Sequence, residues 1–281
     1  ALSGKSDRRA WVDEVRAKVN AINLWASQVG YELLGRPVVV LNYRQGLGRT
    51  RGPRKQSLVE IEVTDTPVTT GHPHGEQIMK GLALHEIGHH LFDIGVRGDR
   101  TLRGIARSEG VDDIYHVLSD ERLERGLRSR RPEWGVYFDR LASYAFAQDV
   151  HAVPLEGLAA IVNRSPEDTR KAVEEDELPG RIVDVSKPGE PVKVALSDGD
   201  MLRIPGLVPP HAAFLASLRC GFDPNACPDP RIAEAIALVP ANLKDLPNNE
   251  VLEVARRIAR VIGKSDRYKR DMVTLHRRLA R

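Results

Sequence analysis

The feature that most restricts this chain is an H-E-x-x-H spacing, formed by His85, Glu86 and His89 within GLALHEIGHHLFD at positions 81–93. Residues four apart on a helix lie one turn apart and roughly 40° from each other around the axis, so both imidazoles can reach one ion. Glu86 then lies beside them, suited to a water molecule rather than to the ion. A helix is predicted because apolar residues recur near helical spacing, at Ile78, Met79, Leu82, Leu84, Ile87 and Leu91.

The chemistry of these side chains favours zinc. Two neutral imidazoles and one carboxylate suit Zn²⁺ and leave a position for water, whose pKa falls to about 7. Glu86 would take a proton from that water and pass it to a leaving amine. We therefore expect a zinc-dependent metallopeptidase with Glu86 as general base and His85 and His89 as ligands.

A second helix, predicted for VDDIYHVLSDERLERGLRSR at 111–130, should supply the third ligand. Asp120 and Glu124 are one turn apart, so Asp120 is expected to bind the ion while Glu124 orients a liganding imidazole. Glu121 and His116 remain competing ligands. The alternative is an exposed charged helix face with internal Glu–Arg pairs.

The sequence does not decide which residue donates a hydrogen bond to the oxyanion of the reaction. Tyr115, His116 and Tyr137 are candidates, because a phenol or an imidazole can donate to a tetrahedral oxygen. His72 and His74 are expected to be exposed loop histidines, since their Gly/Pro-rich surroundings favour a loop.

The composition indicates a globular protein. With 281 residues, 41% hydrophobic, the chain can form one large domain or two modest ones. A net charge of +3 does not by itself argue for nucleic acid. Two cysteines, no apolar signal core at the N-terminus and no run near the roughly 18 apolar residues of a membrane span make a cytoplasmic location without membrane contact the expectation.

The first half should be α+β. A helix is predicted from Ser6 to Gly30, and strands at 37–43 and 57–65. The second strand is our candidate for pairing with an extended substrate. Residues 44–55 carry five basic residues and no acid, which indicates a solvated, mobile loop or, as an alternative, a nucleic-acid contact. Residues 95–110 are expected to be a loop punctuated by glycine.

The two predicted helices resemble the metallopeptidase-like region of cobalt-chelatase-type and MoxR-associated proteins that carry von Willebrand A domains. That family has a KGL-x-x-HE-x-x-H helix and a later Y-N-x-L-E-D-x-R-I-E helix. This chain has Lys80-Gly81-Leu82 before His85, and YHVLSDERLE at 115–124. The resemblance implies a gluzincin-like fold over about 57–150.

Two positions depart from that pattern. His116 stands where the family has Asn, and Ser119 where it has Glu. If the family ligand is the Glu that Ser119 replaces, a catalytically silent zinc scaffold that docks a partner ATPase or von Willebrand A protein becomes an alternative function. The family's own von Willebrand domain is not expected here, because the nearest string, DVSKP at 184–188, lacks its second serine.

The second half, 151–281, is expected to be a mainly helical accessory domain after a zincin-like domain at 1–150. Two short helices should flank Asn163–Pro166, and a β-hairpin is predicted near 192–204. Helices followed by a hairpin raise the further alternative of a DNA-binding adaptor or nucleic-acid-recruited protease. The acidic second helix disfavours it.

Overall fold

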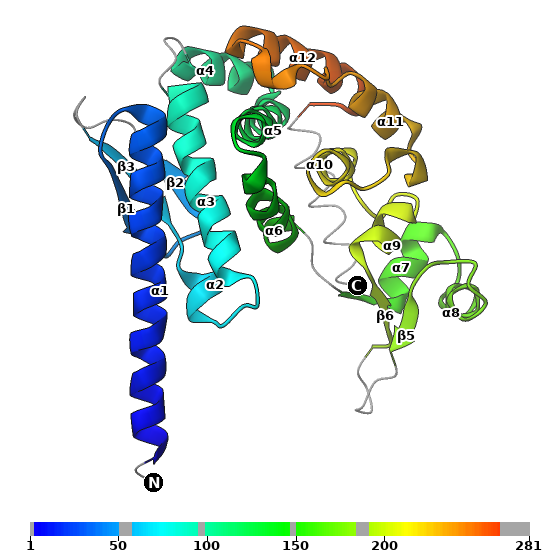
Figure 1. Cartoon of the computed structure of the whole chain (residues 1–281). Helices are drawn as coiled ribbons and strands as arrows, with labels where there is room; N and C mark the ends of the chain where they lie inside the picture. The colour runs from blue at the N-terminus through cyan, green and yellow to red at the C-terminus, as the bar shows by residue number, and fades with distance from the viewer. Residues whose placement is uncertain (1–2, 51–57, 95–98, 147–149, 184–190, 265–281) are drawn as a thin grey trace. The chain divides into compact units, whose positions relative to one another are not determined.

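The computed structural model describes residues 3–50, 58–94, 99–146, 150–183 and 191–264, and their fold is α+β (Figure 1). The chain divides by its contacts into two compact units. The first comprises Ala1–Thr101 with Ser119–Ala145, and the second comprises Leu102–Leu118 with Phe146–Arg281. The expected first domain, 1–150, therefore does not coincide with the first unit, because residues 102–118 pack with the second. Residues 265–281, which belong to the expected helical second domain, lie outside the described residues.

The first unit is built on a three-stranded sheet with the order β1-β3-β2. β1 (Val38–Asn42) runs parallel to β3 (Val59–Val63), and β2 (Gly48–Thr50) runs antiparallel to it. The expectation that 57–65 pairs with substrate is wrong, because both edges of β3 are already occupied. The expectation of a loop over 44–55 is also wrong in part, because this segment supplies the edge strand β2.

Helices cover this sheet with apolar side chains. α1 (Ser3–Leu34) and α3 (Gly75–His89) bury Ile22, Ala26, Ile78 and Leu82 against the strands. α1 continues past its expected end, since Gly30 stays helical and touches β1: a Cβ there would lie 2.5 Å from Val38 Cγ2. The first unit also holds α2 (Thr66–Thr69), η2 (Pro132–Trp134) and α6 (Gly135–Phe146).

The segment between the two motif helices, expected to be a loop at 95–110, contains a helix. α3 passes directly into a single π-helical stretch, η1 (His90–Ile94). α4 (Asp99–Glu109) then forms because Leu102, Ile105 and Ala106 recur at helical spacing and pack into an apolar core. α5 (Asp112–Arg130) begins in the second unit and ends in the first.

The second unit contains a small antiparallel sheet with the order β4-β6-β5. The predicted hairpin near 192–204 is wrong: only its first half is a strand, β6. Ser197 and Asp200 form a reciprocal capping box, which satisfies free N–H groups and starts helix α9 in place of a second strand. The sheet elements are β4 (His151–Pro154), β5 (Arg181–Val183), β6 (Lys193–Leu196) and α9 (Asp198–Arg203).

The remaining helices of the second unit follow the predicted pattern. α7 and α8 are separated by Asn163 in a left-handed conformation and by Ser165, which caps α8. Within the described residues, no helix is long and apolar enough to cross a membrane. The helices are α7 (Leu155–Val162), α8 (Pro166–Glu174), α10 (Pro210–Cys220), α11 (Pro230–Ala237) and α12 (Asn248–Ile262), with short turns η3 (Pro224–Ala226) and η4 (Leu243–Asp245).

Candidate metal centre

Three side chains from α3 and α5 converge in the first unit. The Nε2 atoms of His85 and His89 lie 3.2 Å apart, and Asp120 Oδ1 lies 3.7 Å from each. Ligands of a tetrahedral zinc ion with bonds of about 2.0–2.1 Å stand roughly 3.3–3.4 Å apart. The nitrogen pair fits that spacing and the carboxylate oxygen exceeds it by a few tenths of an ångström. This group can therefore hold a metal ion.

Glycine lets the two helices approach closely enough. A Cβ on Gly88 would lie 2.8 Å from Leu123 Cδ1 and 3.1 Å from Leu127 Cδ1. Both leucines are fully buried. This contact fixes the position of α5 along α3, and with it the position of Asp120 relative to His85 and His89.

Each imidazole is oriented by a carboxylate. His85 Nδ1 lies 2.9 Å from Glu124 Oε1, the interaction expected of Glu124, and His89 Nδ1 lies 2.7 Å from Asp93 Oδ2. Because an ionised carboxylate only accepts hydrogen bonds, Nδ1 must carry the proton in both rings. Nε2 is then the nitrogen of each ring that would bind an ion, which in His85 means that the ion takes the place of a proton.

Asp93 is a residue that the sequence reasoning missed. It is 1% exposed, and Arg122 of α5 donates to its Oδ1 at 2.8 Å and to the Phe92 carbonyl oxygen at 3.0 Å. The i,i+4 spacing from His89 was the available signal. It was hidden by the change from α- to π-helix at His90.

Glu86 is held by the edge strand. Its side chain is buried, and the Thr50 hydroxyl donates to Oε2 at 2.5 Å. β2 lies directly over the carboxylate, because a Cβ on Gly48 would be 2.5 Å from Oε1. The sequence of β2 does not indicate that Thr50 contacts Glu86, because this contact depends on how β2 pairs with β3.

The surroundings of the centre shift the pKa values of two histidines in opposite directions. Burial lowers the pKa of His85, but Asp120 and the hydrogen-bonded Glu124 outweigh burial and raise it to about 9. His90, 3% exposed, has a pKa lowered to about 4, chiefly by burial and also by the positive charge of Arg36. His90 therefore belongs to the core as a neutral ring.

The competing ligands have other surroundings. Glu121 accepts a hydrogen bond from Arg125 Nε at 2.7 Å, so the alternative of a Glu–Arg pair describes this residue. His116 is exposed. Asp120, rather than either of these, joins the two histidines.

The candidate oxyanion donors do not lie in the metal-binding group. Tyr115 is 2% exposed in the apolar core of the second unit. Tyr137 packs edge-on against Trp25, with ring centroids 5.9 Å apart, and the Lys80 ammonium lies 5.7 Å from its centroid.

The two loop histidines precede α3. His72 is exposed, as expected, and its ring lies edge-on to Tyr144. His74 is half-buried rather than exposed, and its Nδ1 lies 3.1 Å from Gln77 Oε1.

Comparisons with protein-family models, with curated proteins and with solved structures found no match for this chain.

Proposed function

We propose that the first unit is a zincin-like domain and that the protein is a zinc-dependent metallopeptidase. The observation that supports this most is the convergence of His85, His89 and Asp120 within ligand spacing, with Glu86 one residue from the first ligand. Two imidazoles and one carboxylate are a zinc donor set. Each imidazole also has the carboxylate partner that liganding histidines normally have.

In the proposed reaction, Glu86 transfers the proton and Thr50 orients Glu86. Zinc, when bound, would lower the pKa of a water to about 7 and polarise the scissile carbonyl. Glu86 accepts the proton of the attacking water at its carboxylate and returns it to the leaving amine. The hydrogen bond from Thr50 fixes the orientation of Glu86 for both transfers.

The edge strand suggests how a peptide is held. Among the described strands, β2 pairs only with β3, and its Thr50 contacts the proposed base. An extended peptide that adds to the outer edge of β2 would lie beside Glu86, held by backbone hydrogen bonds. The proposed substrate class is therefore an extended peptide segment.

The substitution Glu86→Gln tests this function. The variant should keep zinc and lose cleavage of a peptide library by about 10²–10⁴-fold, because a general base contributes that much. Glu121→Gln, which removes a carboxylate paired with Arg125 rather than placed among the ligands, is the matched control and should cleave normally. Unchanged cleavage in Glu86→Gln would contradict the proposal.

A zinc-binding scaffold without catalysis is the second candidate. It is favoured by Ser119, 2% exposed and adjacent to Asp120, where the resembled family has Glu. In that case zinc-loaded wild-type protein cleaves nothing, and a partner ATPase or von Willebrand A protein binds wild type and Glu86→Gln equally.

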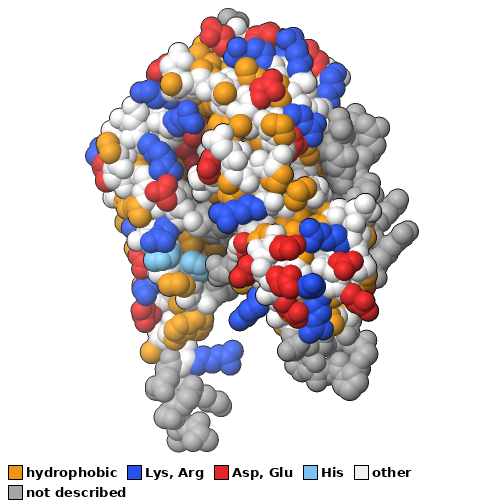
Figure 2. All heavy atoms as spheres, turned by 90° about the vertical axis from the view of Figure 1, so that its right-hand side faces the viewer, with side chains coloured by type: hydrophobic (Ala, Val, Ile, Leu, Met, Phe, Trp, Pro, Cys, Tyr) orange, Lys and Arg blue, Asp and Glu red, His pale blue; other side chains and the backbone are white. Residues whose placement is uncertain are grey.

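The structure gives little support to a nucleic-acid function. Arg49, in the basic segment, is paired with Glu62 at 3.2 Å. On the face shown in Figure 2, basic and acidic side chains are interspersed and form no basic band. Salt-dependent binding of DNA to the protein would instead support a nucleic-acid function.

A further inference from the structure

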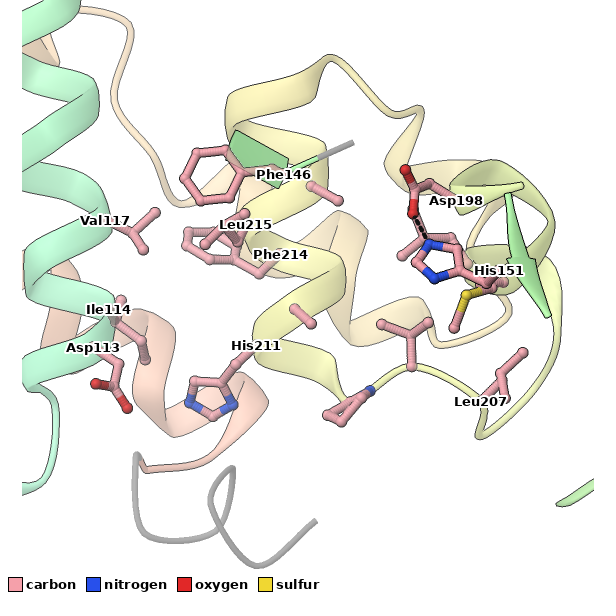
Figure 3. Close-up of a pocket in the computed structure, with 16 residues that line it drawn as sticks. Asp113, Ile114, Val117, Phe146, His151, Asp198, Leu207, His211, Phe214 and Leu215 are labelled. Atoms are coloured by element: carbon pink, nitrogen blue, oxygen red, sulfur yellow. Dashed lines mark hydrogen bonds and ion pairs between the residues drawn. The ribbon is translucent and has the colours of Figure 1, made fainter. Parts of the chain in front are cut away.

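A cavity of about 450 Å³ lies within the second unit, and none of its lining residues belongs to the metal-binding group. This volume falls in the range of roughly 300–1,000 Å³ that holds small-molecule ligands. In Figure 3 the lining residues lie on both sides of α10, with the first turns of α5 on one side and α9 and the loop that follows it on the other. The cavity therefore extends across this helix and is elongated.

Apolar side chains make up most of the cavity wall. Ile114 and Val117 of α5 line one side, and Leu207, which follows α9, lines the other (Figure 3). Leu207 is fully buried, and Phe214 of α10 is 1% exposed. Buried, well-packed side chains keep their rotamers, so the cavity does not need to be opened by a ligand.

Small side chains of α10 provide the space. Ala212 and Ala216 both line the cavity and are one helical turn apart, so they occupy the same face of α10. Both are half-buried. A larger side chain at either position would therefore extend into the cavity.

The polar groups of the wall already interact with other groups of the protein. His151 Nε2 lies 2.5 Å from Asp198 Oδ1, so this carboxylate has a hydrogen-bond partner. Asp113 and His211 also take part in interactions of their own. None of the lining residues that the structure describes is Lys or Arg. The described wall therefore favours neither a cationic nor an anionic ligand.

The energetics of transfer from water then favour an uncharged ligand. A charged group that enters an apolar cavity loses its hydration, and here it gains no ion-pair partner from the described wall. Each CH₂ group that leaves water strengthens binding by about fourfold. A cavity of roughly 150 Å³ holds benzene, so one of about 450 Å³ has room for roughly three times as many carbon atoms.

We propose that this cavity binds an uncharged, elongated apolar molecule of up to about 18 carbon atoms, which lies across α10 over Ala212 and Ala216 and between Val117 and Leu207. This site is independent of the metal centre and of the function proposed for it.

Three probes of equal chain length test the charge preference: octanol, octylamine and octanoate, each titrated calorimetrically into the full chain at pH 7 and fixed salt. Octanol should bind saturably and at least about tenfold more tightly than either ion, because only the alcohol enters the cavity without losing the hydration of a charge. Absence of saturable octanol binding, or binding of either ion as tight as that of octanol, overturns the proposal.

A series of alcohols tests whether the chain is buried. From hexanol to octanol to decanol, each step adds two CH₂ groups and should tighten binding roughly tenfold, because all three chains are shorter than the cavity allows. Equal affinities for the three alcohols would mean that the added carbons stay in water, which contradicts the proposal.

Paired variants locate the binding. Ala216 lines the cavity on α10, whereas Ala160 is an exposed alanine of α7 outside it. Ala216→Leu should weaken octanol binding tenfold or more, because the larger side chain fills part of the cavity, and Ala160→Leu should leave binding unchanged. Equal effects of the two substitutions would place the ligand elsewhere and overturn the proposal.

A second pair keeps the test valid if Ala216→Leu does not fold. Phe146 lines the cavity and is 42% exposed, so Phe146→Ala removes part of the wall at little cost in packing. Val136 of α6 is 43% exposed and does not line the cavity. Phe146→Ala should weaken octanol binding several-fold, whereas Val136→Ala should not change it. Unchanged binding in Phe146→Ala would contradict the proposed position of the ligand.

Discussion

The Nδ1 atom of His89 lies 2.7 Å from Oδ2 of Asp93, and Arg122 from a different helix donates to the other oxygen of the same carboxylate. Both Asp93 and Arg122 are at least 97% buried as side chains. The orientation of the His89 ring in the candidate metal centre is therefore set by an ion pair that also joins η1 to α5.

Replacing Asp93 by Asn should weaken zinc binding by about 10–100-fold, because loss of the orienting carboxylate reduces ligand basicity. It should also lower the free energy of unfolding by about 3 kcal/mol, since Arg122 loses its buried charge partner. Chelator competition on the folded variant measures the first effect and urea unfolding the second. Asp139→Asn, which breaks the exposed contact with Arg128, is the control. Unaltered zinc affinity in Asp93→Asn would show that Asp93 does not orient the ligand.

Thr50→Val removes the hydroxyl that donates to Glu86 and keeps the shape of the side chain. Peptide cleavage should fall about tenfold, the effect of roughly 1.4 kcal/mol on the barrier, while zinc affinity stays the same. Thr50→Ser retains the donor and should restore most of the rate. The comparison is made as kcat/KM on zinc-loaded protein. A serine variant as slow as the valine variant would mean that packing, not the hydrogen bond, is responsible.

His90 should make the zinc-free protein sensitive to mild acid. Its folded pKa is about 4 against 6.5 for an ordinary histidine, so the unfolded chain binds the extra proton between these values. Above pH 6.5 His90 is neutral in both the folded and the unfolded chain, and the folded protein has its full stability. As the pH falls towards 4, the unfolded chain takes up a proton that the folded chain does not, and the free energy of unfolding decreases. From pH 7 to 5 the loss is about 2 kcal/mol.

The measurement is urea unfolding of chelator-treated wild type and His90→Gln at both pH values. The loss of stability should be smaller in the variant by the amount assigned to His90. Parallel losses in the two proteins would refute this source of acid sensitivity.

Gly88→Ala should separate α3 from α5. The added methyl group meets Leu123 at 2.8 Å, so the free energy of unfolding should fall by about 1–3 kcal/mol and zinc affinity with it. Gly104 is also helical, in α4, but a Cβ there meets nothing within 4 Å. Gly104→Ala should therefore stabilise by about 0.5–1 kcal/mol through helix propensity. Thermal unfolding and zinc titration of both variants check the pair; a harmless Gly88→Ala would contradict the close contact.

The sequence predicted the parts of the centre that depend on helical spacing. His85 and His89 share a turn of α3, and Asp120 and Glu124 share a turn of α5, so their relative positions follow from the period of the helix. Asp93 was not predicted, because the helical period changes from α to π after His89.

Errors elsewhere have similar physical causes. Strand order within a sheet is a long-range property, and the strand expected to pair with a substrate, β3, is the central strand of its sheet. Alternating residues at 192–204 favoured a hairpin, but the local capping box of Ser197 and Asp200 begins a helix there. Thr50 could not be found from the sequence, because its contact with Glu86 spans 36 positions and depends on that same strand order.

The central claim is that Asp120 completes a zinc site with His85 and His89. Zinc stoichiometry and affinity, measured by chelator competition on wild type, Asp120→Ala and its neighbour Glu121→Ala, test it most directly. We expect one ion per chain in wild type, an affinity for zinc at least about a hundredfold lower in Asp120→Ala, and no change in Glu121→Ala. Wild-type protein without zinc, or loss of affinity in Glu121→Ala with Asp120→Ala unaffected, would contradict it.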